Sequence, residues 1–238
     1  MNTTIARLAV QSLVGQRRGI VLAVLPVVLV LLALAVALLT EGPAAYEVIV
    51  GALGFGLVLP LVALLVTTGV LGPEIDDGSI VYLLSKPVSR LTVAVSKLAV
   101  AVGVTAALGA GPLVLAGLIL DPGEAGRAAA VGVGALVSGT AYCAVFVMLS
   151  ALNRHGMVSG LIYVLAFEGL LAGLLSGLRY LSVAAFGRRV AEAIDDGVDL
   201  PASDIGLPYA VLAALLVIVV GALIAGQRLR SFQLRGEE

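Results

Sequence analysis

The sequence has few of the residues from which disulfides, metal sites and nucleotide sites are built. Its 238 residues include one cysteine and one histidine, Cys143 and His155. One of each cannot form a disulfide or a multi-ligand metal site within one chain. The only lysines are Lys86 and Lys97, and neither follows a glycine, so a phosphate-binding loop of the GxxxxGK[ST] type is absent. We therefore expect no cofactor or metal in this chain, and no ATP hydrolysis by it alone.

Charged residues are also scarce, which indicates a membrane protein. They make up 12% of the chain, compared with about 25% in soluble domains, whereas hydrophobic residues make up 61%. A soluble domain of this size buries only about 70% of the surface that its unfolded chain exposes. It would leave too much apolar surface in water. The net charge of −1 provides no basic surface for nucleic acid. We expect an integral membrane protein whose surroundings are the lipid bilayer.

Six apolar runs are long enough to cross a bilayer as helices, which need about 20 mostly apolar residues each. They cover residues 19–39, 48–71, 98–120, 128–152, 157–178 and 207–226. The sequence thus predicts an all-α, polytopic membrane protein with six transmembrane helices, forming a single domain over residues 1–238. Pro60 and Pro112 lie inside the second and third runs and predict kinks there.

The basic residues predict the orientation of these helices. With a cytoplasmic N-terminus, ten of the 14 Lys and Arg residues lie on the inner side: Arg7, Arg17, Arg18, Lys86, Arg90, Lys97, Arg154, Arg228, Arg230 and Arg235. Because positive charge concentrates in cytoplasmic loops, we expect both termini in the cytoplasm.

Two segments outside the runs show helical patterns. Residues 3–18 place apolar side chains on one face, which suggests a short helix lying in the inner membrane interface. An ordinary extension of the first span explains this pattern equally well. The outer loop, 179–206, repeats apolar residues at helical spacing, at Val183, Phe186, Val190 and Ile194. This predicts an amphipathic helix or hairpin that lies over the outer mouth or dips into it. A merely solvated outer helix is the alternative.

The long inner loop, 72–97, has an acidic start, a glycine, an apolar middle at 80–84 and a Pro-x-x-Arg corner. An exposed apolar face of this kind usually meets a partner. The alternative is a loop whose apolar residues fold back onto the membrane.

One ionisable residue, Glu168, lies near the middle of the fifth predicted span. A carboxylate at that depth costs about 2.5 to 3.5 kcal/mol, so it should face a cavity or a partner. We favour a structural carboxyl that binds neighbouring helices by hydrogen bonds over a pathway carboxylate that handles substrate or a proton. The glycines that follow at four-residue spacing allow close helix contact, within the chain or at a homodimer seam. They are Gly169, Gly173 and Gly177.

The inner loop and the start of the third span present ten residues in a recognisable order: Glu74, Gly78, Ser79, Leu83, Leu84, Ser85, Pro87, Ser89, Arg90 and Lys97. This order resembles the cytoplasmic segment of the type-2 ABC exporter permeases of the single six-helix kind, in which a lysine opens the third helix. The similarity extends along the chain to the run YVLAFEGLLAGLL, which contains Tyr163 and Glu168. The chain looks most like the branch with the permease of the nitrous-oxide-reductase maturation transporter.

The resemblance implies a permease subunit of an exporter in the plasma membrane. Separate ABC ATPase subunits would bind ATP and Mg, and residues 72–97 would contain the coupling helix that seats in the ATPase. A second permease copy would pair with the first, as a homodimer or with a paralogue, and residues 179–206 would form short extracellular helices that cap the exit. Two other functions remain open: a secondary transporter driven by an ion gradient, with Glu168 as proton carrier, and a membrane anchor for a partner enzyme.

Overall fold

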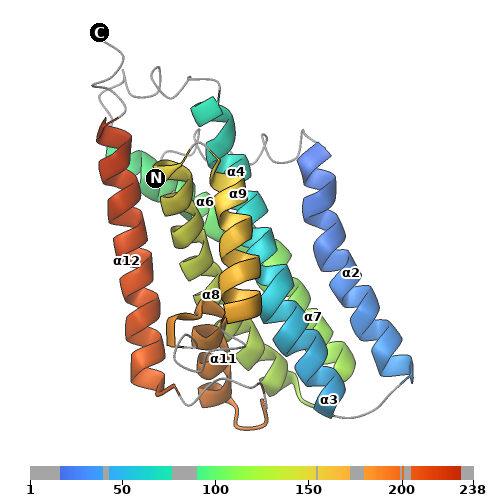
Figure 1. Ribbon diagram of the computed structural model, residues 1–238. Helices are drawn as coiled ribbons and strands as arrows, with labels where there is room; N and C mark the ends of the chain where they lie inside the picture. Colours follow the sequence, from blue (N-terminus) through green and yellow to red (C-terminus); the bar gives the residue numbers. More distant parts are fainter. Residues whose placement is uncertain are drawn as a thin grey trace.

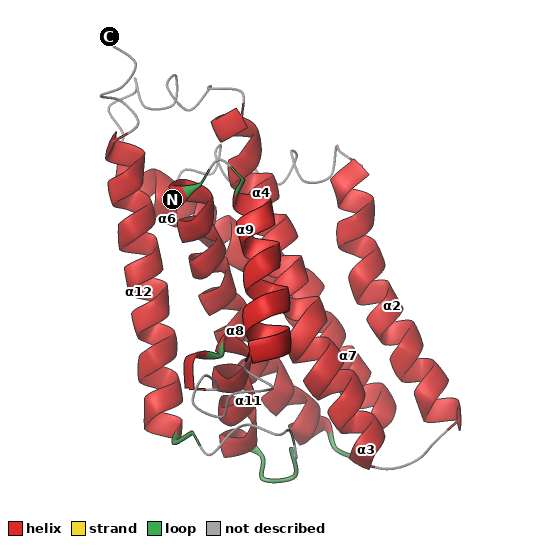
Figure 2. Cartoon of the chain, viewed as in Figure 1, coloured by secondary structure: helices red, strands yellow, loops and turns green. Residues whose placement is uncertain are grey.

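Every regular element that the computed structural model describes is a helix, so the predicted all-helical fold is confirmed (Figures 1 and 2). The described residues are 17–39, 43–76, 90–153, 155–171, 180–198, 200 and 205–231. Their helical elements are α2 (Arg17–Leu39), α3 (Pro43–Tyr46), η1 (Glu47–Val58), α4 (Leu59–Asp76), α6 (Arg90–Thr105), η2 (Ala106–Ala110), α7 (Gly111–Leu120), α8 (Ala125–Leu152), α9 (Gly156–Ile162), η3 (Tyr163–Leu171), α11 (Val183–Ile194) and α12 (Leu207–Ser231). The elements η1, η2 and η3 are π-helical.

Helix α8 lies at the centre of the bundle. It contacts α4, α6, α7, α11 and α12, whereas α2 packs mainly against α7 and η1. Helices α2 and α12 stand at opposite edges of the bundle (Figure 1). Their outer faces expose large apolar side chains such as Leu31 and Leu216. Apolar side chains on the outside of a helical bundle are expected where lipid is the solvent.

Among the described residues, five helices are long and apolar enough to cross a membrane, which makes this a multi-pass membrane protein. They are Ile20–Leu39, Ala44–Val70, Val95–Leu120, Ala125–Leu152 and Leu207–Arg228. These helices coincide with five of the six predicted spans. The predicted span 157–178 corresponds to α9 and η3, where the described apolar helix Gly156–Gly169 is shorter. The rest of that span, like the predicted interfacial helix up to residue 16, lies outside the described residues.

The two prolines that predicted kinks lie where the helix changes type. Pro60 is the second residue of α4 and follows η1, and Pro112 is the second residue of α7 and follows η2. Proline has no N–H to donate and its ring crowds the carbonyl four residues earlier. In the π-helical segment before each proline, a backbone N–H bonds to the carbonyl five residues earlier, instead of the carbonyl four residues earlier as in an α-helix.

Helices extend into both ends of the predicted inner loop, 72–97. Helix α4 continues to Asp76 and α6 begins at Arg90, whereas the apolar spans on either side end at Val70 and begin at Val95. Lys97 consequently lies two turns inside α6 instead of opening the third helix. Its side chain is only 2% exposed, and its ammonium donates to the carbonyl of Val70 in α4 over 3.2 Å. This acceptor offsets part of the cost of burying a charge inside a helix pair.

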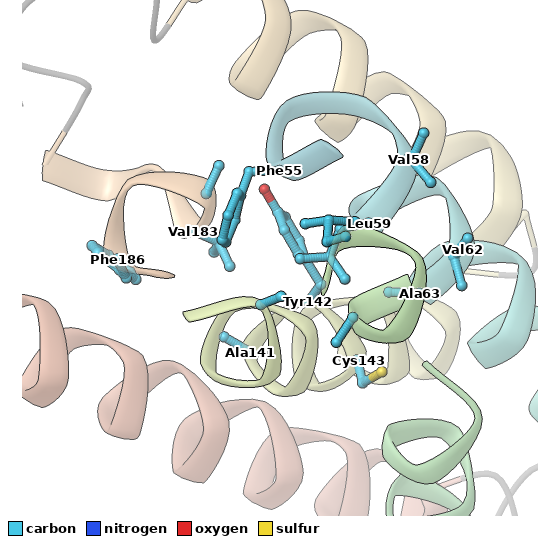
Figure 3. Packing of buried hydrophobic residues seen from close by; sticks show 14 of the residues in the cluster. Phe55, Val58, Leu59, Val62, Ala63, Ala141, Tyr142, Cys143, Val183 and Phe186 are labelled. Carbon is cyan, nitrogen blue, oxygen red and sulfur yellow. The ribbon is translucent and has the colours of Figure 1, made fainter. Parts of the chain in front are cut away.

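The core continues from the helices of the bundle into α11. Figure 3 shows Phe55 of η1, Tyr142 of α8 and Val183 of α11 meeting side by side. All three are buried, as is Phe186 on the next turn of α11. Helix α11, which belongs to the predicted outer loop, therefore shares one hydrophobic core with the bundle.

Candidate functional site

Helix α11 lies at the end of the bundle opposite the start of α2, beside α8 and the beginning of α12 (Figure 1). Ser182 caps it: its hydroxyl oxygen accepts the N–H of Ala185 over 3.2 Å, which satisfies one of the free amides of the first turn. The face that carries Val183 and Phe186 is buried. This burial favours the interpretation in which the outer segment dips into the bundle over that of a merely solvated helix.

Two glycines allow α11 to approach α8 at backbone distance. A methyl group added to Gly134 of α8 would overlap the carbonyl oxygen of Gly187 in α11. One added to Gly187 would overlap Ser138 and the Gly134 carbonyl. The Ser138 hydroxyl also donates to the carbonyl of Val183 over 2.8 Å. The contact between α8 and α11 is therefore close and directional.

Glu168 of η3 binds the N-terminus of α11 from the other side. Its Oε2 accepts the Ser182 hydroxyl over 2.6 Å, and its Oε1 accepts the Val183 N–H over 2.7 Å. The Tyr163 hydroxyl makes a longer contact with Oε1, at 3.5 Å. A carboxylate is favourable at this position because the first amides of a helix lack backbone acceptors and carry partial positive charge. These two hydrogen bonds attach η3 to the first turn of α11.

Arg188 of α11 interacts electrostatically with Glu168. Its guanidinium lies against η1: an ideal Cβ at Gly56 would be 3.5 Å from Nη2. Burial lowers the pKa of Arg188, and the charges of Tyr142, Glu168, Glu192 and Glu47 act in the opposite direction. Arginine keeps its proton in such surroundings because its unperturbed pKa is so high. The carboxyl group of Glu168 thus lies between a helix N-terminus and a partly buried arginine.

A row of aromatic rings fixes η3 against α8. Tyr142 stacks on Phe146 with ring centroids 5.9 Å apart, and Phe146 meets Tyr163 edge-on at 6.1 Å. Tyr163 in turn stacks on Phe167 at 5.4 Å. Such pairs are worth about 0.5 to 1.5 kcal/mol each beyond their burial. The row holds the start of η3 in a defined position relative to α8.

The structure describes only part of the predicted coupling segment. The backbone of Glu74 belongs to the last turns of α4, and Arg90 begins α6. Lys97 joins these two helices through Val70. The other predicted coupling residues lie outside the described residues: Gly78, Leu83, Leu84, Ser85 and Pro87.

The predicted glycine stripe is described at only one position. Gly169 is exposed, and among the described residues an ideal Cβ there would meet only the carbonyl oxygen of Val164, at 3.7 Å. The described part of the chain therefore brings no other helix close to Gly169. Gly173 and Gly177 lie outside the described residues.

Sequence reasoning missed the partners of Glu168 and the glycine contact beneath α11. Ser182 directly precedes the amphipathic pattern of α11, and a serine in that position usually caps a helix. Its capping role could therefore have been predicted from the sequence. Gly134 and Gly187 were not recognisable among 29 glycines. Their importance depends on which backbone lies opposite each of them.

Comparison with protein-family models and with curated proteins gives no match to this chain. Within the part of the chain that the structure describes, no three His, Cys, Asp or Glu side chains form a group that could hold a metal ion.

Proposed function

We propose that this chain is the transmembrane permease subunit of an ATP-binding-cassette exporter, which forms the translocation pathway and is driven by a separate ATPase subunit. The observation that carries the proposal is the sequence of residues from Glu74 to Lys97, whose types and order resemble the cytoplasmic segment of these permeases. This segment connects α4 to α6, two packed helices of the bundle. The Lys97 contact with Val70 joins these helices near the segment. A force applied to the segment would thus reach the bundle through two connected helices.

The proposed permease crosses the plasma membrane six times, with both termini in the cytoplasm. The support is geometric: α8 ends at one end of the bundle and α12 begins at the other (Figure 1). The chain between Leu152 and Leu207 must therefore pass from end to end, and α9 with η3 begins that passage. The excess of basic residues at the end where α2 begins supports a cytoplasmic location for that end.

Cysteine labelling in intact cells tests this orientation. In a Cys143→Ala background, we expect a cysteine at Asp196 to react with an impermeant thiol reagent, because Asp196 is exposed at the outer end beside α11. A cysteine at Asp77 should react only after the cells are opened. The reverse pattern would show that the termini lie outside.

The proposed partners are ABC ATPase subunits, which bind ATP and Mg, and a second permease copy. Affinity purification of the tagged chain in mild detergent, with mass spectrometry of the proteins that accompany it, tests the first partner. We expect an ATPase with a phosphate-binding loop in near-stoichiometric amount. Two differently tagged copies expressed together should also purify as a pair if the permease is a homodimer. A chain that purifies without any ATPase would contradict the proposal.

The secondary-transporter alternative has less support. A proton carrier needs a carboxylate whose oxygens are available to the transported proton. Both oxygens of Glu168 accept hydrogen bonds from the chain itself, from Ser182 and Val183. These hydrogen bonds are better suited to a carboxyl group that attaches η3 to α11 than to one that carries a proton.

A further inference from the structure

The contact between Tyr163 and Glu168 depends on the π-helical form of η3. In an α-helix each residue advances by 100°, so residues five apart point about 140° away from one another. In a π-helix the backbone bonds join residues five apart, which brings such residues to the same face. The Tyr163 hydroxyl and Glu168 Oε1 lie 3.5 Å apart although five positions separate them. Glu168 therefore faces α11 because of the helix type.

Helix α11 and η3, which the Glu168 hydrogen bonds connect, differ in how firmly each packs against the rest of the bundle. Helix α11 meets α8 at backbone distance through Gly134 and Gly187, and Ser138 bonds its first carbonyl. The start of η3 is held through Tyr163 and Phe146. Further along η3, Leu165 is 55% exposed and Gly169 is exposed as well. Within the described residues, the part of η3 that carries Glu168 is thus held by fewer contacts than α11, which packs closely on α8.

We propose that Glu168 is a conformational latch: π-helical η3 holds the N-terminus of α11 through Glu168, and conversion of η3 to an α-helix releases it. With Tyr163 fixed, the conversion turns Glu168 away from Ser182 and Val183. The first turn of α11 then loses its carboxylate, while its body remains on α8. Tyr142, Tyr163 and Arg188 face this carboxylate from α8, η3 and α11 and remain near the released helix end. This device belongs to the fold of the chain and does not depend on the proposed ATPase.

Hydrogen–deuterium exchange of the chain in lipid nanodiscs tests the latch. The decisive variant is Ile162→Cys/Gly169→Cys in a Cys143→Ala background, treated with a membrane-permeant, thiol-reactive cross-linker about 10 Å long. Both residues are exposed. Residues seven apart lie two turns apart on one face of an α-helix, whereas they lie on different faces of a π-helix, so bridging them favours the α-helical form of η3. We expect exchange at the first turn of α11 to become about tenfold faster on bridging, because two hydrogen bonds to a charged group are lost. The same protein before bridging is the matched control.

Two substitutions of Glu168 complete the experiment. Glu168→Leu should accelerate exchange at the first turn as bridging does, whereas Glu168→Gln keeps an acceptor oxygen and should remain close to the parent chain. In every case the residues around Gly187 should keep their protection, because α8 still holds them. The inference fails if bridging has no effect while Glu168→Leu does, since Glu168 is then a static cap. It fails also if Glu168→Leu has no effect, or if the whole of α11 loses protection.

Discussion

Replacing Gly134 or Gly187 by alanine is expected to destabilise the chain by about 3 kcal/mol, at the upper end of the usual range for overpacking. Each added methyl group overlaps backbone atoms of the facing helix, and backbone atoms cannot relieve an overlap by a change of rotamer. We expect α11 to separate from α8, which exposes the core around Val183 and Phe186. Unfolding of the purified variants in detergent, followed by circular dichroism against denaturant, measures the loss.

Gly103→Ala is the matched control, because an ideal Cβ at Gly103 of α6 has no neighbour within 4 Å among the described residues. Alanine is the better helix former by about 1 kcal/mol, so this variant should be no less stable than the parent. The double variant Gly134→Ala/Gly187→Ala should cost less than the sum of the two, since one opened contact relieves both overlaps. Additive losses would show that the two glycines do not face one another.

Leu83→Asp is expected to abolish co-purification of the ATPase, with binding weakened by at least about thirtyfold. The substitution places an unpaired carboxylate in what the resemblance identifies as the apolar contact with that subunit, where desolvation is costly. Arg90→Ala should weaken binding less, because it removes an anchor at the start of α6 without burying a charge. The yield of ATPase per permease after affinity purification measures both effects.

Gln227→Asp is the control for added charge at the same end of the bundle, since Gln227 is exposed near the end of α12. It should leave the ATPase yield unchanged. The thermal stability of Leu83→Asp should match that of the parent chain if the substituted residue lies at a partner surface. An unchanged yield for Leu83→Asp would contradict the docking proposal, whereas lost stability would place Leu83 in the fold of the permease itself.

The sequence by itself determined the properties that depend on neighbouring residues. The length of each apolar run decided where helices long enough to span a bilayer occur, because this depends only on consecutive side chains. Helical spacing predicted the amphipathic face of α11, and the scarcity of charge identified the membrane as the solvent. Glu168 was also recognised, because a charged residue inside an apolar run is conspicuous whatever surrounds it.

Only the tertiary structure decided which distant groups meet. Whether Glu168 binds a substrate or a helix N-terminus depends on the position of Ser182 and Val183, which a separate segment supplies. The burial of Lys97 two turns inside α6 required an acceptor in α4, and no local pattern reveals that acceptor. Gly134 and Gly187 matter because two backbones approach there, and glycine looks the same in the sequence whether a backbone, a lipid or open space lies opposite. Such contacts are set by the packing of whole helices against α8, which a linear pattern does not encode.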